Sequence, residues 1–205
     1  MRVDEGYIKF TSDWTPGPPP ERSIVDLLNT WRRPLHEAGL IGHYAEPGIG
    51  YGNISARCDQ PGKFVISGTQ TGHLPVPDAE HYALVTAYDI AGNSVSCTGM
   101  VQASSESLTH AAIYELDPTI GAVVHVHSKR LWRELLGQLP TTSESISYGT
   151  PEMANEFKRL YKTTAFAKTG IAIMAGHEEG IISMGVTLDQ AANRVLKINP
   201  DCQKR

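Results

Sequence analysis

Two histidines in one short apolar run are the residues of this chain that most clearly suggest chemistry. His125 and His127 lie within GAVVHVH at positions 121–127, a segment rich in β-branched residues that predicts a buried strand. Side chains two positions apart on a strand point to the same face, so both imidazoles would project together. Converging neutral imidazoles are typical zinc ligands, at about 2.0–2.1 Å. A hydrogen-bonded pair of structural histidines is the alternative reading of this motif alone.

A metal site of this kind needs a third protein ligand, and His177 is the best candidate. It lies between two apolar segments, and the glycines at positions 176 and 180 would let the backbone reach inward. His73 and His81 are rivals, but both have polar, loop-like surroundings. Three histidines would leave a tetrahedral zinc one open position, as in catalytic sites. Such a zinc can polarise a carbonyl or stabilise an enediolate as a Lewis acid.

Chemistry of this type also needs a base, and Glu106 is the candidate. Ser105 is expected to cap a helix, which would place Glu106 in the first turn, where the helix dipole favours a carboxylate. His110 follows four residues later and would face the same side. Pro118 ends the helix before the histidine-bearing strand begins. Helix and strand are therefore consecutive elements that could bring Glu106 to the metal.

Small polar residues could hold an anion beside this site. The chain has no lysine-bearing P-loop, but hydroxyls and backbone amides at turns and helix starts can bind phosphate without one. A plain surface loop is the alternative for the segment 67–72. The candidate phosphate-binding residues are Asn53, Ser67, Thr69, Thr71, Gly72, Ser104 and Ser105.

Composition limits the classes of protein to which the chain can belong. With 205 residues, 40% hydrophobic and 20% charged, it fits an ordinary soluble globular protein. A net charge of −4 and the lack of basic blocks give no reason to expect a nucleic-acid partner. No apolar run predicts a membrane span or a signal peptide. Cys58, Cys97 and Cys202 are too widely spaced for a disulfide framework, so we expect free thiols and a cytoplasmic protein.

The order of elements predicts an α/β fold in one domain. Residues 1–20 are expected to form an extended N-terminal arm because of the proline run at 16–20, and residues 21–205 the domain. Several strands connect as hairpins, which favours a central mixed, largely antiparallel sheet flanked by helices. Helices are expected from Ile24, with Ser23 as cap, and over 106–117, 129–136, 151–161 and 188–198. Strands are expected at 54–57, 63–67, 82–88, 94–97, 121–127, 169–174 and 181–184.

The motifs and their order along the chain resemble those of the class II aldolase/adducin family, and within it those of the fuculose-phosphate-aldolase-like zinc aldolases. The resemblance covers about residues 24–197 and implies an α/β/α sandwich, usually a homotetramer with sites at subunit interfaces. It implies zinc held by the three histidines, Glu106 as acid/base, and a phosphorylated sugar as substrate. Sugar-phosphate members cleave a ketose 1-phosphate to dihydroxyacetone phosphate and an aldehyde through a zinc-stabilised enediolate. The motifs are 52–55, 67–72, 104–106 with His110 and Tyr114, 125–127 and His177.

Two features depart from the family pattern. The third ligand commonly stands in His-His-Gly or Asn-His-Gly, whereas this chain has Gly-His-Glu-Glu-Gly at 176–180. The insertion would either bring Glu178 or Glu179 near the metal or lengthen the loop. The catalytic tyrosine that the family takes from a neighbouring subunit has no certain match, although Tyr148 lies in the right region.

Three functions are compatible with the motifs. The first is a zinc-dependent aldolase acting on a sugar phosphate. The second is a relative that uses the same site as a methylthioribulose-phosphate-type dehydratase or as an epimerase, although epimerases of the family often have aspartate in place of Glu106. The third is a non-catalytic adducin-like module, but such relatives typically lose metal histidines, and this chain has all three.

Overall fold

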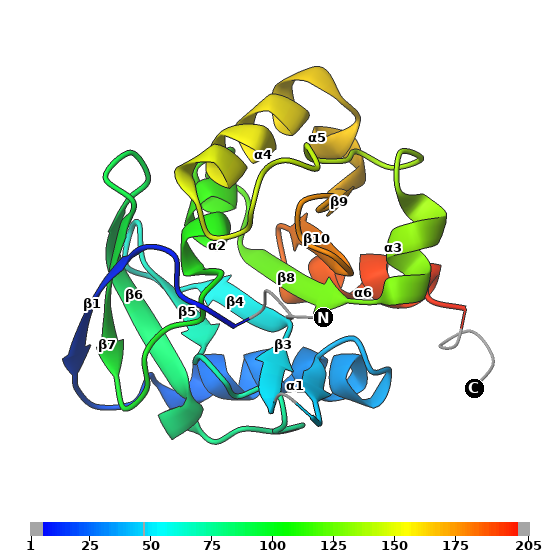
Figure 1. Cartoon of the computed structure of the whole chain (residues 1–205). Helices are drawn as coiled ribbons and strands as arrows, with labels where there is room; N and C mark the ends of the chain where they lie inside the picture. Colours follow the sequence, from blue (N-terminus) through cyan, green and yellow to red (C-terminus); the bar gives the residue numbers. More distant parts are fainter. Residues whose placement is uncertain (1–5, 47, 201–205) are drawn as a thin grey trace.

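The computed structural model describes residues 6–46 and 48–200 and has three layers, with helices on both faces of one central sheet (Figure 1). The sheet has eight strands in the order β1-β7-β6-β5-β4-β8-β10-β9. The pair β1 and β7 is parallel, and every other neighbouring pair is antiparallel. The predicted α/β/α sandwich with a mixed, largely antiparallel sheet is confirmed.

Most strands fall where alternation and turn residues predict them. A separate two-stranded ribbon, β2 with β3, precedes the main sheet and was not predicted. The strands are β1 Thr11–Pro16, β2 Gly42–Tyr44, β3 Ile49–Tyr51, β4 Asn53–Arg57, β5 Phe64–Ser67, β6 Tyr82–Asp89, β7 Ser94–Gly99, β8 Ala122–His127, β9 Ile171–Ile173 and β10 Gly180–Gly185.

The helices form two groups that cover opposite faces of the sheet. Leu108 of α2, Phe157 of α4 and Phe166 of α5 belong to one apolar core, and Leu28 of α1, Leu131 of α3 and Val195 of α6 belong to the other. Burial of these apolar stripes is what holds the layers together. The helices are α1 Arg22–Glu37, α2 Ser107–Tyr114, α3 Lys129–Leu135, α4 Pro151–Thr163, α5 Phe166–Thr169 and α6 Leu188–Ile198, and a 3-10 turn spans Ala79–His81.

The helix caps differ in part from those predicted. At the start of α6, the hydroxyl of Thr187 accepts a hydrogen bond from the amide of Gln190, and the residues at 187–190 have the spacing of a capping box. The prediction for Ser23 was wrong, because α1 begins at Arg22 and Glu21 precedes it without a side-chain cap. The prediction for Ser105 was also wrong, because Glu106 itself occupies the cap position of α2. Glu106 therefore lies just before the helix instead of in its first turn.

Part of the predicted N-terminal arm, Thr11–Pro16, is extended as strand β1 and lies against its own chain. Strand β1 pairs with β7 at the edge of the sheet, which is where a strand ending in proline is tolerated. Phe10, just before it, is buried in the core that α2 and α4 cover. The sequence predicted the extended backbone but not this pairing. Met1 to Glu5 and Cys202 lie outside the described residues.

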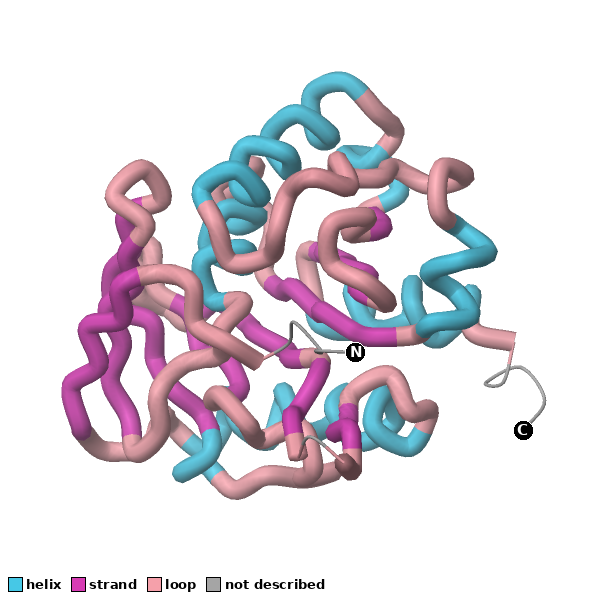
Figure 2. Tube along the Cα trace, in the orientation of Figure 1, coloured by secondary structure: helices cyan, strands magenta, loops and turns pink. Residues whose placement is uncertain are grey.

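The loop from α3 to α4 runs beside the turn between β9 and β10 (Figure 2). Backbone hydrogen bonds tie this loop to the last residue of β9, from the amide of Thr142 to the carbonyl of Ile173 and from the amide of Ile173 to the carbonyl of Pro140. Cys58 and Cys97 are free, as expected. No helix among the described residues combines the length and the apolar character needed to cross a bilayer.

Candidate metal centre and active site

The sheet places His125 and His127 as their spacing predicts. Both lie on β8, on the same face as the buried Val123, while Val124 and Val126 pack into the opposite core. Strand β8 is central, between β4 and β10, and both imidazoles are buried. Their Nε2 atoms are 3.1 Å apart. Two neighbouring strand histidines therefore converge on one point.

His177 joins them from the turn between β9 and β10. One ligand atom from each of the three histidines lies within 4.8 Å of the others. The backbone at Gly176 makes this turn possible, because a Cβ there would come within 1.9 Å of the carbonyl oxygen of Ile146. The rings of His125 and His177 stack, with centroids 5.0 Å apart. The rivals His73 and His81 do not belong to the group.

The donor chemistry of this cluster fits a metal ion. The Nδ1 atom of His125 is 3.2 Å from the carbonyl oxygen of Ile181, which can only accept, so the lone pair of the neutral ring is on Nε2. Burial, and then the neighbouring His127 and His177, hold the pKa of His125 well below its usual value. The buried Nε2 lone pair of His125 needs a cation or a proton to interact with. Because burial disfavours a protonated imidazole, a cation suits it better. Two nitrogens bound to one tetrahedral zinc lie about 3.3 Å apart, close to the distance found here.

Glu106 reaches the same cluster from the start of α2. Its side chain is fully buried, and its Oε1 lies 3.4 Å from Nδ1 of His177. A tight turn presents it: the carbonyl of Ser104 accepts from the amide of Ser107, and the hydroxyl of Ser104 accepts from the amide of Glu106. The carboxylate thus lies beside His177, one of the three clustered histidines.

The candidate phosphate residues surround a narrow polar pocket. Asn53 pairs with His125 across β4 and β8, so the pocket and the histidines share one face of the sheet. Ser67 does not line the pocket, and its hydroxyl accepts from the amide of Ile54 instead. Thr69 and Thr71 of the loop both line it. The lining residues are Gly6, Gly50, Gly52, Asn53, Gly68, Thr69, Gln70, Thr71, Gly72, Ser104 and Ser105.

A buried arginine holds the loop of this pocket. Arg32 of α1 is fully buried and donates to the carbonyls of Thr71 and Leu74, at 2.7 and 3.1 Å. Burial lowers the pKa of its guanidinium, and Tyr82 partly opposes this effect. On the other side of the loop, a Cβ at Gly72 would lie 2.0 Å from the carbonyl oxygen of Gly42. The loop is therefore fixed between α1 and the β2–β3 ribbon.

A second buried network lies next to Glu106. The hydroxyl of Ser55 is 2.7 Å from Nδ1 of His110 and 2.8 Å from the hydroxyl of Tyr114. Burial lowers the pKa of His110 to about 3, so this ring is neutral at physiological pH. The network joins α2 to strand β4 and thereby helps to fix the helix whose cap position holds Glu106.

Tyr148 contacts the histidine cluster from within the same chain. Its ring stacks on that of His177, with centroids 4.3 Å apart, and its hydroxyl accepts from the amide of Tyr7 at 3.1 Å. Lys9 lies 3.7 Å over the other side of the ring. The structure thus shows a packing partner for His177.

Sequence reasoning missed Tyr44, whose hydroxyl is 3.2 Å from Nδ1 of His127. No pattern in the sequence could have found it, because it lies on the unpredicted ribbon. Of the two glutamates inserted after His177, Glu179 faces the site through Tyr44, and Glu178 is exposed. The glycines at positions 50 and 52 were likewise not named as pocket residues.

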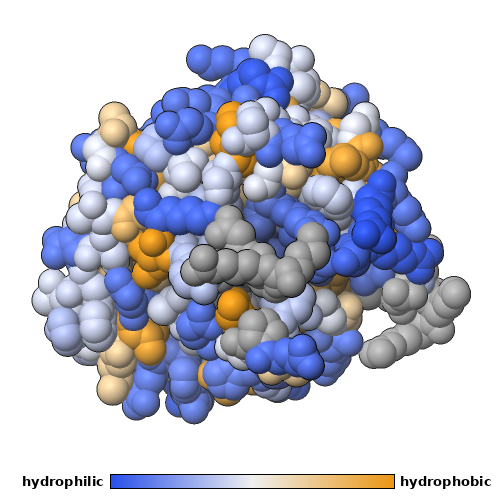
Figure 3. Space-filling view, viewed as in Figure 1, coloured by the Kyte–Doolittle hydropathy of each residue, from blue (hydrophilic) through white to orange (hydrophobic). Residues whose placement is uncertain are grey.

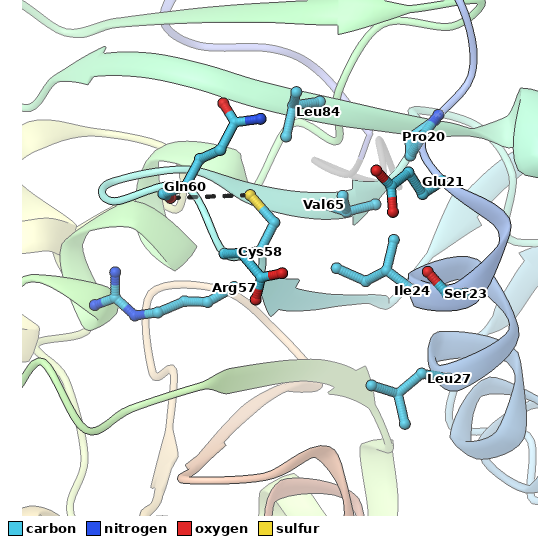
Figure 4. A pocket seen from close by; sticks show the side chains of 11 residues that line it. Pro20, Glu21, Ser23, Ile24, Leu27, Arg57, Cys58, Gln60, Val65 and Leu84 are labelled. Atoms are coloured by element: carbon cyan, nitrogen blue, oxygen red, sulfur yellow. Dashed lines mark hydrogen bonds between the residues drawn. The ribbon is translucent and has the colours of Figure 1, made fainter.

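Another pocket, of about 370 Å³, lies away from the histidines between α1 and the turn after β4 (Figure 4). Ile24 and Leu27 line it from the helix, and Cys58 and Gln60 from the turn. None of the candidate site residues contributes to it.

The face of the molecule in Figure 3 is mostly hydrophilic, with only isolated hydrophobic residues.

Comparison with known proteins places the chain in a family. Residues 48–203 match the sequence model described as the class II aldolase and adducin N-terminal domain. The chain belongs to the class II aldolase and adducin family. The match includes the histidine cluster, Glu106 and the polar pocket apart from Gly6.

Two curated relatives of this family member are methylthioribulose-1-phosphate dehydratases. The protein from Hahella chejuensis (strain KCTC 2396) is 29% identical over 110 residues, 53% of this chain and 48% of that protein. The protein from Pseudomonas aeruginosa (strain LESB58) is 42% identical over 77 residues, 37% of this chain and 34% of that protein. The chain thus spans less than half the length of these two curated relatives.

The solved structure of an L-fuculose 1-phosphate aldolase has the same fold as this family member. The TM-score is 0.66 at 20% identity, and the match covers 91% of this chain and 85% of the other. At this identity the likeness concerns the fold, and the reaction has to be argued from the site.

Proposed function

We propose that this protein is a zinc-dependent lyase that acts on a phosphorylated sugar and uses Glu106 as its acid/base. One observation carries the proposal: three buried histidines converge, and the Glu106 carboxylate lies 3.4 Å from one of them. Zinc, when bound, supplies a Lewis acid that polarises a substrate carbonyl. Membership of a family of aldolases supports the reaction class.

In the proposal, different residues bind the phosphate and transfer the proton. In the proposal, Thr69, Thr71, Ser104 and Ser105 hold the phosphate, and Asn53 lies between them and His125. Glu106 moves a proton at the carbon next to the carbonyl. Its carboxylate is shielded from water because the side chain is buried, which favours transfer to substrate over exchange with solvent.

Retro-aldol cleavage is the first candidate reaction. The hydroxyl on the second carbon from the ketone loses its proton and becomes the aldehyde carbonyl. The bond from that carbon to the carbon next to the ketone breaks, the electron pair stays with the ketone fragment, and one proton is delivered to the carbon next to the ketone. For a ketose 1-phosphate the products are dihydroxyacetone phosphate and an aldehyde. The fold shared with an L-fuculose 1-phosphate aldolase supports this candidate.

Dehydration of a methylthioribulose-phosphate-type substrate is the second candidate. Here Glu106 would remove the proton from the carbon next to the carbonyl, and the hydroxyl on the following carbon would leave as water. The observation in its favour is that the curated relatives are dehydratases, up to 42% identical over the matched residues. Epimerase activity has less support, because this site has Glu106 where such relatives often have aspartate.

Product analysis on a panel of ketose 1-phosphates tests the proposal and separates its two forms. An aldehyde with dihydroxyacetone phosphate indicates the aldolase, and a dicarbonyl phosphate with no carbon lost indicates the dehydratase. A zinc-loaded protein that turns over none of the panel would contradict both and favour the adducin-like module. We further propose a homotetramer with sites at subunit interfaces, as the family resemblance implies, and a cytoplasmic location, as the unpaired cysteines suggest.

A further inference from the structure

A short hydrogen-bonded chain lies behind His127, on the side away from the other histidines. The hydroxyl of Tyr44 is 3.2 Å from Nδ1 of His127 and donates to Oε2 of Glu179 at 2.9 Å. Tyr44 comes from the β2–β3 ribbon and Glu179 from the turn between β9 and β10. Three segments far apart in the sequence thus meet at one hydroxyl group.

The chemistry of these groups fixes the direction of each hydrogen bond. A carboxylate oxygen can only accept, so the single hydroxyl hydrogen of Tyr44 points to Glu179. The Tyr44 oxygen then has lone pairs to offer, and Nδ1 of His127 must carry the hydrogen that it donates to them. In a neutral imidazole, this leaves the lone pair on Nε2.

The same reasoning applies to the neighbouring ligand and gives a consistent picture. Nδ1 of His125 faces the carbonyl of Ile181, so its lone pair is also on Nε2. The two Nε2 atoms, 3.1 Å apart, then present lone pairs to one point. The Tyr44 hydroxyl thus favours this tautomer over the other one, in which Nε2 bears a hydrogen and cannot bind a metal.

The surrounding contacts hold this chain in place. The ring of Tyr44 packs on that of Tyr51, with centroids 4.7 Å apart. The carbonyl of Glu179 accepts from the amide of Ser128 at 3.0 Å, and its carboxylate lies 3.8 Å from Nζ of Lys129. The backbone of Glu179 has φ of 70°, which few non-glycine residues adopt. A fixed donor and acceptor can orient a ligand more effectively than mobile ones.

We propose that Tyr44 and Glu179 are positioning residues that hold His127 with Nδ1 protonated and Nε2 directed at the metal. The inference rests on the metal centre of the proposed function and adds to it a tyrosine–carboxylate pair that acts through His127. Neither side chain needs to touch the substrate.

Zinc affinity, measured by competition with a chromophoric chelator, is the direct test. Tyr44→Phe keeps the ring and removes the hydroxyl, and we expect zinc to bind about 10- to 100-fold more weakly. Tyr51→Phe is the matched control, because its ring lies 5.5 Å from that of His127 but its hydroxyl donates to the carbonyl of Gly39. The control should bind zinc as tightly as the wild type.

A second pair of variants tests the carboxylate. Glu179→Gln removes the charge at nearly constant size, and we expect weaker zinc binding than in the wild type. Glu178→Gln, the exposed neighbour, should leave affinity unchanged. Nitrogen-15 NMR of the zinc-loaded protein adds a structural readout: the Nδ1 hydrogen of His127 should exchange slowly in the wild type and faster in Tyr44→Phe.

The outcomes separate this inference from the proposed function. Wild-type zinc affinity and unchanged hydrogen exchange in both Tyr44→Phe and Glu179→Gln would overturn the inference and leave the lyase proposal standing. A wild-type protein that binds no zinc would overturn both. Loss of affinity in Tyr44→Phe and Glu179→Gln, with both controls unaffected, is the result that we expect.

Discussion

Single residues carried most of the functional information in this sequence. The two-residue spacing of His125 and His127 determined that both would share a face, and the strand places them so. His177 was recognisable from its flanking glycines and apolar segments. Tyr44 was not, because its role depends on a contact across 83 positions, and no local pattern encodes a contact of that range.

The carboxylate of Glu106 offers a prediction at this scale. Glu106→Gln keeps the size of the side chain and removes its ability to move a proton, so turnover should fall by about 10²- to 10⁴-fold. Zinc content should stay near that of the wild type, since the three histidines are untouched. Steady-state kinetics with metal analysis on the same sample checks this. Near-normal turnover would exclude Glu106 as the acid/base.

His110 should make the metal-free protein sensitive to mild acid. The unfolded chain takes up a proton on this ring as the pH falls below about 6.5, whereas burial delays protonation in the folded chain until about pH 3. The unfolded state therefore binds more protons in this window, and folding stability falls as the pH falls. Each group of this kind changes the free energy of unfolding by up to about 1.4 kcal/mol per pH unit.

Replacing His110 tests this contribution. In His110→Gln we expect the free energy of unfolding to depend less steeply on pH between about 6.5 and 4.5, by about 1.4 kcal/mol per unit. Urea titrations at several pH values, with a chelator present, measure it. If the free energy of unfolding depended on pH equally steeply in the wild type and in His110→Gln, the His110 ring would not be protected from protonation.

Secondary-structure elements were predicted well where one periodicity dominates. The buried strand β8, the hairpin of β4 and β5, and the capped helix α6 follow from local pattern. The short ribbon of β2 and β3 and the four-residue α5 were missed, because such short elements form only through tertiary contacts. The segment 67–72 was recognisable as an anion-binding candidate, but only the fold shows that Ser67 faces away from the pocket.

Arg32 gives a prediction about the connection between an element and a loop. Arg32→Met removes the two hydrogen bonds that hold the carbonyls of Thr71 and Leu74 to α1. We expect the KM for a phosphorylated substrate to rise about tenfold, or about 1.4 kcal/mol, with little change in kcat. Arg33→Met, at the exposed neighbouring position, is the control. Equal KM values for the two variants would show that the arginine does not support the pocket.

At the scale of the whole molecule, the sequence predicted the layers but not how the chain begins. Hairpin signals and helix periodicities together predicted a mixed sheet flanked by helices, and the family resemblance implied the sandwich with helices on both faces. The N-terminal arm was predicted to be extended, and its residues Thr11–Pro16 form strand β1. Its pairing as the edge strand β1 and the burial of Phe10 depend on surfaces that form only after the sheet has assembled.

Phe10 should therefore matter for global stability. Phe10→Ala removes a ring that is 7% exposed in a core under α2 and α4, which should cost about 3 kcal/mol and lower Tm by several degrees. Tyr7→Ala, whose side chain is 51% exposed, should change Tm little. Equal melting temperatures for Phe10→Ala and the wild type would contradict the packing of this segment.

The proposed homotetramer is tested by light scattering on the wild-type protein. The measured mass should be about four times 22.3 kDa, and a monomer mass would exclude the homotetramer.

The most direct test of the account is an anomalous difference map from crystals of the protein, measured on both sides of the zinc absorption edge. We predict one strong peak per chain, about 2.0–2.1 Å from a ring nitrogen of each of His125, His127 and His177. A zinc-loaded crystal with no peak among these three rings, or with its zinc elsewhere, would contradict the central claim.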